Sequence, residues 1–247
     1  MGELGLASIA FRHLSVEEII AAAKDAGLHW IEWGSDIHAP ADDVQKLDRV
    51  VQLTREAGLE ISSYGTYFRI DRDRPEDIVG YIHAAKRLGT NILRIWCPGN
   101  PGVLTEQERL DRYECCRQVA AIAQDMGAVL CAECHNDNLT DNAQSALELM
   151  RAVDSPAFRM YWQPHPYFSA QENTDFAAAV EAYVANVHVF NWHGRERFPL
   201  EEARTAWQAY AKVLGKDRVY LLEHFQNDDP GLLVQETQTL RSIIEKL

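Results

Sequence analysis

Four polar residues interrupt or end apolar stretches of the sequence, and together their side chains could hold a divalent metal ion. Glu133 lies within "VLCAECHND", Gln163 follows "FRMYW", His188 lies within "VANVHVFNW", and Glu223 lies within "YLLEHF". A buried carboxylate without a partner is costly, so such a group is expected to be paired, protonated or bound to a metal. Two carboxylates, one imidazole and one amide oxygen suit Mn²⁺, Mg²⁺ or Co²⁺, and also admit Zn²⁺ or Fe²⁺.

These residues can meet only if the fold brings distant strands together. Eight short runs rich in β-branched and aromatic residues are predicted to be strands. They span residues 4–11, 29–34, 60–68, 91–98, 128–135, 158–165, 184–192 and 219–225. The sixth run breaks into "QPHP" at 163–166, and because proline cannot donate to a strand ladder, we expect a rigid loop there.

Longer amphipathic stretches separate these runs and are predicted to be helices. They cover 15–27, 41–57, 75–88, 105–126, 140–153, 170–183, 200–214 and 230–247. Ser15 and Glu18 form a capping box at the start of the first, and Gly27, Gly58 and Gly89 follow the ends of the first three. Eight strand–helix units at roughly thirty-residue spacing predict an α/β fold, a single (β/α)8 TIM barrel domain over residues 1–247. The alternative is a doubly wound open sheet, but it usually has fewer strands, and no Gly-rich phosphate turn follows the first run.

The active sites of such barrels lie at the carboxyl ends of the strands. Glu133, Gln163, His188 and Glu223 belong to the fifth to eighth predicted strands, so we expect them to converge on one side of the barrel. Taken singly, either glutamate or the histidine could be a structural ion pair or a satisfied core group. Gln163 alone could be a hydrogen-bonding residue near a substrate. All four residues lie at the same level, near the carboxyl ends of four consecutive predicted strands, and this favours a metal site.

The motifs of this chain resemble those of the xylose-isomerase-like barrels, the sugar phosphate isomerase/epimerase superfamily. The resemblance rests on the eight-unit pattern, the "E-x-H" of Glu133 and His135, the "HVF" of His188 and the final "LLEHF" with Glu223, and covers essentially the whole chain. In that family a Glu, an Asp, a His and a Glu from strands five to eight hold one divalent metal. These roles fall here on Glu133, Gln163, His188 and Glu223. Gln163 replaces the Asp and removes one negative charge, which should strengthen the pull of the metal on substrate oxygens.

The resemblance implies a metal-dependent isomerase or epimerase of a sugar, ketose or polyol, or an inosose-type dehydratase. Mn²⁺ is the first choice of metal, with Mg²⁺, Co²⁺ or Zn²⁺ as alternatives. Removing a proton beside a carbonyl creates an enediolate that a Lewis acid stabilises, and Glu133 and Glu223 are predicted to transfer the proton. A sugar-binding barrel without catalysis is a further alternative, because Gln163 replaces the Asp. The abasic-site endonucleases would need more ligands on the first four strands and a positive groove for DNA.

Other residues near the predicted strand ends could hold a polyol. The candidates are Trp33, Trp96, His135, His165, Arg195 and His13. The family carries a substrate-binding His three residues after its Asp, whereas here Pro166 stands at that place and His165 lies one residue earlier. Plain packing is the alternative for the two tryptophans. Arg195 and Arg197 follow the His188 strand and could face an anionic substrate, or could be solvated loop charges.

Composition narrows the partners and the setting. The 247 residues carry a formal net charge of -13, so nucleic acid is an unfavourable partner. No apolar run is long enough to span a bilayer, and no signal region opens the chain, which favours the cytoplasm and no membrane partner. The five cysteines show no disulfide framework and are expected to be free thiols in or near the core. Cys131 and Cys134 form a C-x-x-C, for which a redox or metal role is the alternative, but no second pair completes a zinc site. The family resemblance also implies a homodimer or homotetramer.

Overall fold

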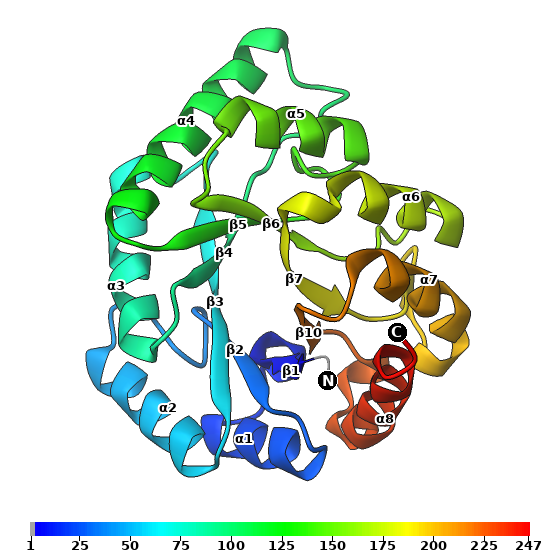
Figure 1. Cartoon of the computed structure of the whole chain (residues 1–247). Helices are drawn as coiled ribbons and strands as arrows, with labels where there is room; N and C mark the ends of the chain where they lie inside the picture. The colour runs from blue at the N-terminus through cyan, green and yellow to red at the C-terminus, as the bar shows by residue number, and fades with distance from the viewer. Residues whose placement is uncertain (1–2) are drawn as a thin grey trace.

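The chain folds into a closed barrel of eight parallel strands, seen in Figure 1 as a computed structural model that describes residues 3–247. Around the ring the order is β1-β2-β3-β4-β5-β6-β7-β10. The strands are β1 Glu3–Ala7, β2 Trp30–Gly34, β3 Glu60–Arg69, β4 Ile92–Trp96, β5 Val129–Glu133, β6 Phe158–Trp162, β7 Val184–Val189 and β10 Val219–Leu222. Each strand begins within one residue of the start of a predicted run, and the predicted (β/α)8 barrel is confirmed.

Eight α-helices surround the barrel (Figure 1). They are α1 Val16–Asp25, α2 Val44–Glu56, α3 Ile78–Leu88, α4 Glu106–Asp125, α5 Ala143–Val153, α6 Ala170–Val180, α7 Arg204–Leu214 and α8 Leu233–Ile244. The predicted capping box of Ser15 and Glu18 is present at the start of α1. α2 and α5 begin later than predicted, because Asp43 caps α2 and Asn142 caps α5 with side-chain hydrogen bonds.

Several predicted elements are longer than the observed ones, and the excess residues form the loops around the site. The first strand ends at Ala7, and Ser8–Phe11 forms the short 3-10 helix η1 instead of continuing the strand. The seventh strand ends at Val189, and the chain then makes a small hairpin of β8 Trp192–His193 and β9 Glu196–Arg197. Parts of the predicted helices are 3-10 segments, namely η2 Pro75–Asp77, η3 Glu181–Tyr183, η4 Leu200–Ala203 and η6 Pro230–Leu232, while η5 Gln226–Asp228 follows the last strand.

The main apolar core lies between the strands and the helices. Successive side chains of a strand point to opposite faces, so each strand sends one set outward to the helices and the other into the barrel. Trp162 on β6, for example, meets Trp207 and Tyr210 of α7 edge-on. A second, small apolar cluster of Cys131, Tyr161 and Leu221 lies apart from this core.

The cysteines agree with the prediction from the sequence. All five cysteines are free thiols, with Cys115 half-buried and the other four buried, as predicted. Within residues 3–247, every helix is too short or too polar to cross a membrane.

Candidate active site

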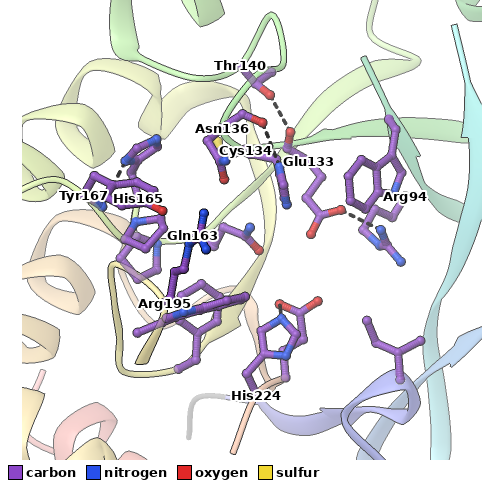
Figure 2. Close-up of a pocket in the computed structure, with 18 of the residues that line it drawn as sticks. Arg94, Glu133, Cys134, Asn136, Thr140, Gln163, His165, Tyr167, Arg195 and His224 are labelled. Atoms are coloured by element: carbon purple, nitrogen blue, oxygen red, sulfur yellow. Dashed lines mark hydrogen bonds and ion pairs between the residues drawn. The ribbon is translucent and has the colours of Figure 1, made fainter. Parts of the chain in front are cut away.

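A cavity of about 380 Å³ opens among the carboxyl ends of the strands and their loops. Glu133 at the end of β5, Gln163 just after β6 and Glu223 just after β10 line it. His188, on β7, is fully buried and contacts all three. The four residues predicted to form one site therefore lie together, and Figure 2 shows Glu133 and Gln163 extending from neighbouring strands.

One nitrogen of His188 faces the oxygen atoms of the other three residues. Its Nδ1 lies 3.1 Å from Gln163 Oε1, 3.3 Å from Glu223 Oε2 and 3.5 Å from Glu133 Oε1. One ligand atom from each of Glu133, His188 and Glu223 lies within 4.8 Å of the others. Glu223 Oε2 is buried and makes no hydrogen bond within the described chain. Three oxygen donors around one imidazole nitrogen, with an unsatisfied carboxylate, fit a divalent cation.

The electrostatics of the site favour positive charge at its centre. Burial alone would lower the pKa of His188, but Glu223 and Glu32 outweigh it and raise this pKa to about 10. Burial alone would raise the pKa of Glu133, but Arg94 and His188 outweigh it and hold this pKa well below its usual range. Each shift comes from opposite charges held close together in a buried space: carboxylates stabilise the protonated form of His188, and the cations stabilise the ionised form of Glu133.

The structure adds two charged residues that the sequence interpretation missed. Arg94 on β4 and Glu32 on β2 are each only 1% exposed. Arg94 Nη1 donates to Glu133 Oε2 at 2.5 Å, and Figure 2 shows the two side chains pointing toward one another. Arg94 Nε lies 3.4 Å from Glu32 Oε1. The signal was present in the sequence, since "WIEWG" and "ILRIW" are apolar strands with one charge each.

Arg94 also connects the charged cluster to an aromatic wall of the cavity. Its guanidinium carbon lies 5.7 Å from the ring centre of Tyr67 and 5.8 Å from that of Trp96. The Trp96 ring in turn packs on His135 with ring centres 4.7 Å apart. All four side chains line the cavity, so the predicted residues Trp96 and His135 lie where a substrate could contact them.

His135 lines the cavity, and its ring makes one hydrogen-bond contact with the backbone. Its Nδ1 lies 2.8 Å from the backbone carbonyl of Asn136, which can only accept a hydrogen bond. Nδ1 therefore carries the proton in the neutral ring, and Nε2 keeps a free lone pair. This histidine is equipped to accept a proton.

His165 also lines the cavity, but both of its ring nitrogens are engaged by protein groups. Its Nε2 lies 2.9 Å from Asp141 Oδ1, and its Nδ1 accepts from the backbone N–H of Tyr167 at 3.3 Å. Asn173 of α6 holds the same loop, because its Oδ1 accepts from the His165 N–H at 2.7 Å and its Nδ2 donates to the His165 carbonyl at 3.1 Å. His165 thus fixes the predicted "QPHP" loop and offers a ring face, rather than a free nitrogen, to a substrate.

The two loop arginines differ in position. Arg195 lies at the tip of the β8–β9 hairpin and lines the cavity, as Gln163 does. The hairpin is held to the loop after β6 because Gly194 N–H donates to the Pro166 carbonyl at 2.9 Å. Arg197 instead pairs with Asp228 and lies 5.1 Å from the Trp192 ring centre.

Two predicted substrate-binding residues do not reach the cavity. Trp33 is fully buried in the main core and packs edge-on against His38. Its neighbour Glu32 points into the barrel, so strand alternation turns Trp33 outward. His13 lies on the exposed turn after η1 and contacts the edge of Phe11. The assignments of Trp33 and His13 to the substrate pocket were therefore wrong.

Comparison with known proteins identifies the family of the chain. The sequence profile of the xylose isomerase-like TIM barrels matches residues 20–243, and the chain belongs to this family. A curated relative, 3-dehydroshikimate dehydratase of Bacillus anthracis, is 24% identical over 249 residues, covering 94% of this chain and 86% of the relative.

Solved structures share the whole barrel. The probable 3-DHS dehydratase of Bacillus anthracis has a TM-score of 0.82 at 18% identity, covering 98% of this chain and 99% of the other. D-Psicose 3-epimerase with D-tagatose from Clostridium cellulolyticum H10 has a TM-score of 0.72 at 14% identity, covering 99% and 98%. A xylose isomerase-like TIM barrel protein from Mycobacterium smegmatis in complex with magnesium has a TM-score of 0.74 at 15% identity, covering 100% and 97%. At these identities the likeness establishes the fold.

Proposed function

We propose that this chain is a divalent-metal-dependent dehydratase that removes water from a hydroxylated, anionic ketone. The observation that carries the proposal is the ion pair between Arg94 and Glu133, with 2.5 Å between Nη1 and Oε2. Among the described residues, Glu133 and Glu223 are the two carboxylates that line the cavity. Arg94 makes one of them a poor base, because it stabilises the charged form of Glu133.

The pairing of Glu133 with Arg94 favours dehydration over epimerisation. Epimerisation needs proton donors and acceptors on both faces of a carbon, and a paired Glu133 is poorly suited to one of these roles. Elimination of water needs a proton acceptor at one carbon and a proton donor for the departing hydroxyl, and a single imidazole can serve both in turn. The dehydratase relative from Bacillus anthracis supports the same choice, as its match extends over 94% of this chain.

Glu133, Gln163, His188 and Glu223 would hold the metal ion. The buried cluster also contains Glu32 and Arg94. With His188 neutral, its three glutamates and one arginine carry a net charge of −2, which a divalent cation balances. Bound there, the ion would act as a Lewis acid on the substrate carbonyl and stabilise the negative charge that develops on its oxygen. Mn²⁺ or Mg²⁺ fits the mainly oxygen-donor set, and the magnesium complex of the Mycobacterium smegmatis barrel agrees with this chemistry.

His135 would move the proton. Its Nε2 takes the proton from the carbon beside the carbonyl, and the electron pair of that C–H bond becomes the enolate. The proton on Nε2 then passes to the hydroxyl on the next carbon, whose C–O bond breaks as the C=C bond forms and water leaves. The Asn136 carbonyl keeps Nδ1 protonated, which leaves Nε2 as the acceptor.

Positive and aromatic groups would orient the substrate. Arg195 and Arg12 both line the cavity, and Arg12 pairs with Asp36 at 2.9 Å and contacts the Tyr67 hydroxyl. These guanidinium groups are rare positive charges in a chain of net charge -13, which favours an anionic substituent on the substrate. Trp96 offers a flat apolar face for the ring or carbon chain.

The test is an assay of elimination. The protein loaded with Mn²⁺ is incubated with 3-dehydroshikimate, with inososes and with ketoses in deuterated water. We expect loss of water from the carboxylated ketone, seen as a rise in ultraviolet absorbance from the new conjugated double bond. Exchange of deuterium into a ketose, without elimination from any substrate, would overturn the dehydratase assignment.

A second candidate is a sugar isomerase or epimerase, the first expectation from the sequence. It is favoured by the presence of both Glu133 and Glu223 at one cavity, with ligand atoms within 4.8 Å, and by the structural likeness to D-psicose 3-epimerase. The same deuterium experiment distinguishes the two, because isomerisation and epimerisation exchange a carbon-bound proton without producing a conjugated product.

A further inference from the structure

Glu32 is the one carboxylate of the buried cluster that stands behind the site rather than at its surface. It lies on β2, on the first half of the barrel, and is 1% exposed. The lining of the cavity includes Glu133 and Glu223 but does not include Glu32. A carboxylate buried in this way acts through the groups that it contacts, because it cannot touch a substrate.

Two groups of the site contact Glu32 through a single oxygen. Its Oε1 lies 3.4 Å from His188 Nε2 and 3.4 Å from Arg94 Nε. Its other oxygen, Oε2, accepts from the Ser63 hydroxyl at 3.0 Å, which fixes the carboxylate plane. Glu32 Oε1, His188 Nε2 and Arg94 Nε make no hydrogen bond of ordinary geometry within residues 3–247, so the two 3.4 Å contacts are the interactions that join them. The Tyr161 hydroxyl is a further neighbour of the Glu32 carboxylate.

We propose that Glu32 is a positioning residue that orients His188 and Arg94 for the metal site. The nitrogen that faces Glu133, Gln163 and Glu223 is Nδ1, and a nitrogen that binds a metal must be free of a proton. The proton of the neutral ring must then lie on Nε2. A carboxylate at Nε2 accepts that proton in a hydrogen bond, and so selects the tautomer and fixes the plane of the ring.

Glu32 also holds Arg94 through a different nitrogen, Nε, from the Nη1 that donates to Glu133. Because two carboxylates contact the guanidinium, Arg94 cannot turn toward a substrate anion without weakening a contact in a buried space. The orientation of the Arg94–Glu133 pair, and hence of the Glu133 oxygens, depends on this second contact.

The neighbouring strand leaves room for this arrangement. A Cβ atom on Gly65 of β3 would lie 2.8 Å from Glu32 Oε1 and 3.1 Å from Arg94 Nη2. Any larger residue at Gly65 would displace the two charged side chains from their contact. Glu32, Ser63, Gly65 and Arg94 therefore form a support for His188 and Glu133 that is built from strands β2 to β4.

This inference rests on the metal site of the proposed function, and its test separates the two. Binding of Mg²⁺ and Mn²⁺ to Glu32→Gln and to Glu32→Asp is measured by calorimetry, beside the wild type. Both variants should bind about 10- to 100-fold more weakly, the first because it lacks the charge and the second because its carboxylate is one methylene short. The matched control is Glu236→Gln, which changes a buried glutamate of α8 that accepts from the Leu200 N–H at 2.8 Å and should leave metal affinity unchanged.

A second readout needs no metal. The Nε2 proton of His188 is followed by nitrogen-15 NMR in the metal-free protein, with circular dichroism to check that each variant is folded. We expect a slowly exchanging, downfield resonance in the wild type that moves upfield in Glu32→Gln. An unchanged resonance, or wild-type metal affinity in both Glu32 variants, would overturn the positioning role. Failure of the wild type to bind metal would instead refute the metal site, and the resonance would still decide the role of Glu32.

Discussion

Replacing Arg94 by methionine should destabilise the metal-free protein strongly at neutral pH. The side chain is 1% exposed and lies between two buried carboxylates, at 2.5 Å from Glu133 and 3.4 Å from Glu32. Removing one partner of a buried ion pair costs about 3–5 kcal/mol, because the remaining charge has no compensation. For a protein of this size, each kcal/mol lowers Tm by about 2–4 °C, so the expected decrease is about 6–20 °C.

The pH dependence of this loss follows from the carboxylates. Burial raises the pKa of Glu133 and of Glu32, but their cationic neighbours outweigh it and hold both pKa values below the ordinary value. Their ionised forms therefore contribute stability above the unfolded pKa of about 4.3, and this contribution is lost as pH falls through the folded values. The difference in Tm between wild type and Arg94→Met should be largest near pH 7 and should shrink toward pH 4, where the unpaired carboxylates take up protons.

The assay is thermal unfolding of the metal-free proteins, followed by addition of Mn²⁺. A cation at 100 times its dissociation constant stabilises the folded state by about 2.7 kcal/mol, so metal should restore part of the lost stability of Arg94→Met. Arg87→Met is the matched control, because Arg87 pairs with Asp48 at 2.6 Å on the exposed surface and should change Tm little. Equal Tm values for Arg94→Met and Arg87→Met at pH 7 would refute the account of the buried charge cluster.

Three further predictions concern single groups of the site. Gln163→Asp should tighten metal binding, measured by calorimetry, because it adds a negative charge. It should also lower turnover, because that charge weakens the pull of the metal on substrate oxygens. Unchanged affinity and turnover would exclude this role for Gln163. His135→Asn should lower kcat by about 10²–10⁴-fold, the usual range for loss of a general base, while calorimetry shows unchanged metal affinity; a fall in affinity would instead make His135 part of the metal site. In the metal-free protein, the pKa of His188 is raised to about 10, against about 6.5 in the unfolded chain. The stability contributed by protonated His188 is therefore complete below pH 6.5 and is lost as pH rises toward 10. In thermal melts, His188→Gln should not show this fall in Tm with rising pH.

The fold was predictable from the sequence because each unit carries its own local signals. Apolar runs of strand length alternate with amphipathic stretches that begin at capping residues such as Ser15 and end before glycines such as Gly27. The ends of the strands were less predictable. Ser8–Phe11 looks like a continuation of the first strand in the sequence. Its observed conformation depends on tertiary hydrogen bonds, from the Gly34 N–H to the Ser8 hydroxyl and between that hydroxyl and His38 Nδ1.

The metal-site candidates were predictable because a barrel fixes where strand ends meet. Glu133, His188 and Glu223 each stand out as one polar group in an apolar strand, and the fold brings them together. Arg94 and Glu32 carry the same signal, but their strands lie on the other half of the ring, and the sequence does not show which charges meet across the interior.

The substrate-binding candidates depended on side-chain direction and on local hydrogen bonds. Because Glu32 points into the barrel, the next residue of the strand, Trp33, points outward. An error of one residue in the predicted register of a strand exchanges its inward and outward side chains. The Asp141 partner of His165 lies twenty-four residues away in the sequence, so its engagement became visible only in the fold.

The central claim is that one divalent cation binds where Glu133, Gln163, His188 and Glu223 converge. Calorimetric titration of the metal-free protein with Mn²⁺ tests it most directly, with Glu223→Gln as the paired variant. We expect one ion per chain for the wild type and binding weakened at least about 10-fold for Glu223→Gln. Absence of uptake by the wild type, or equal affinity for the two proteins, would contradict it.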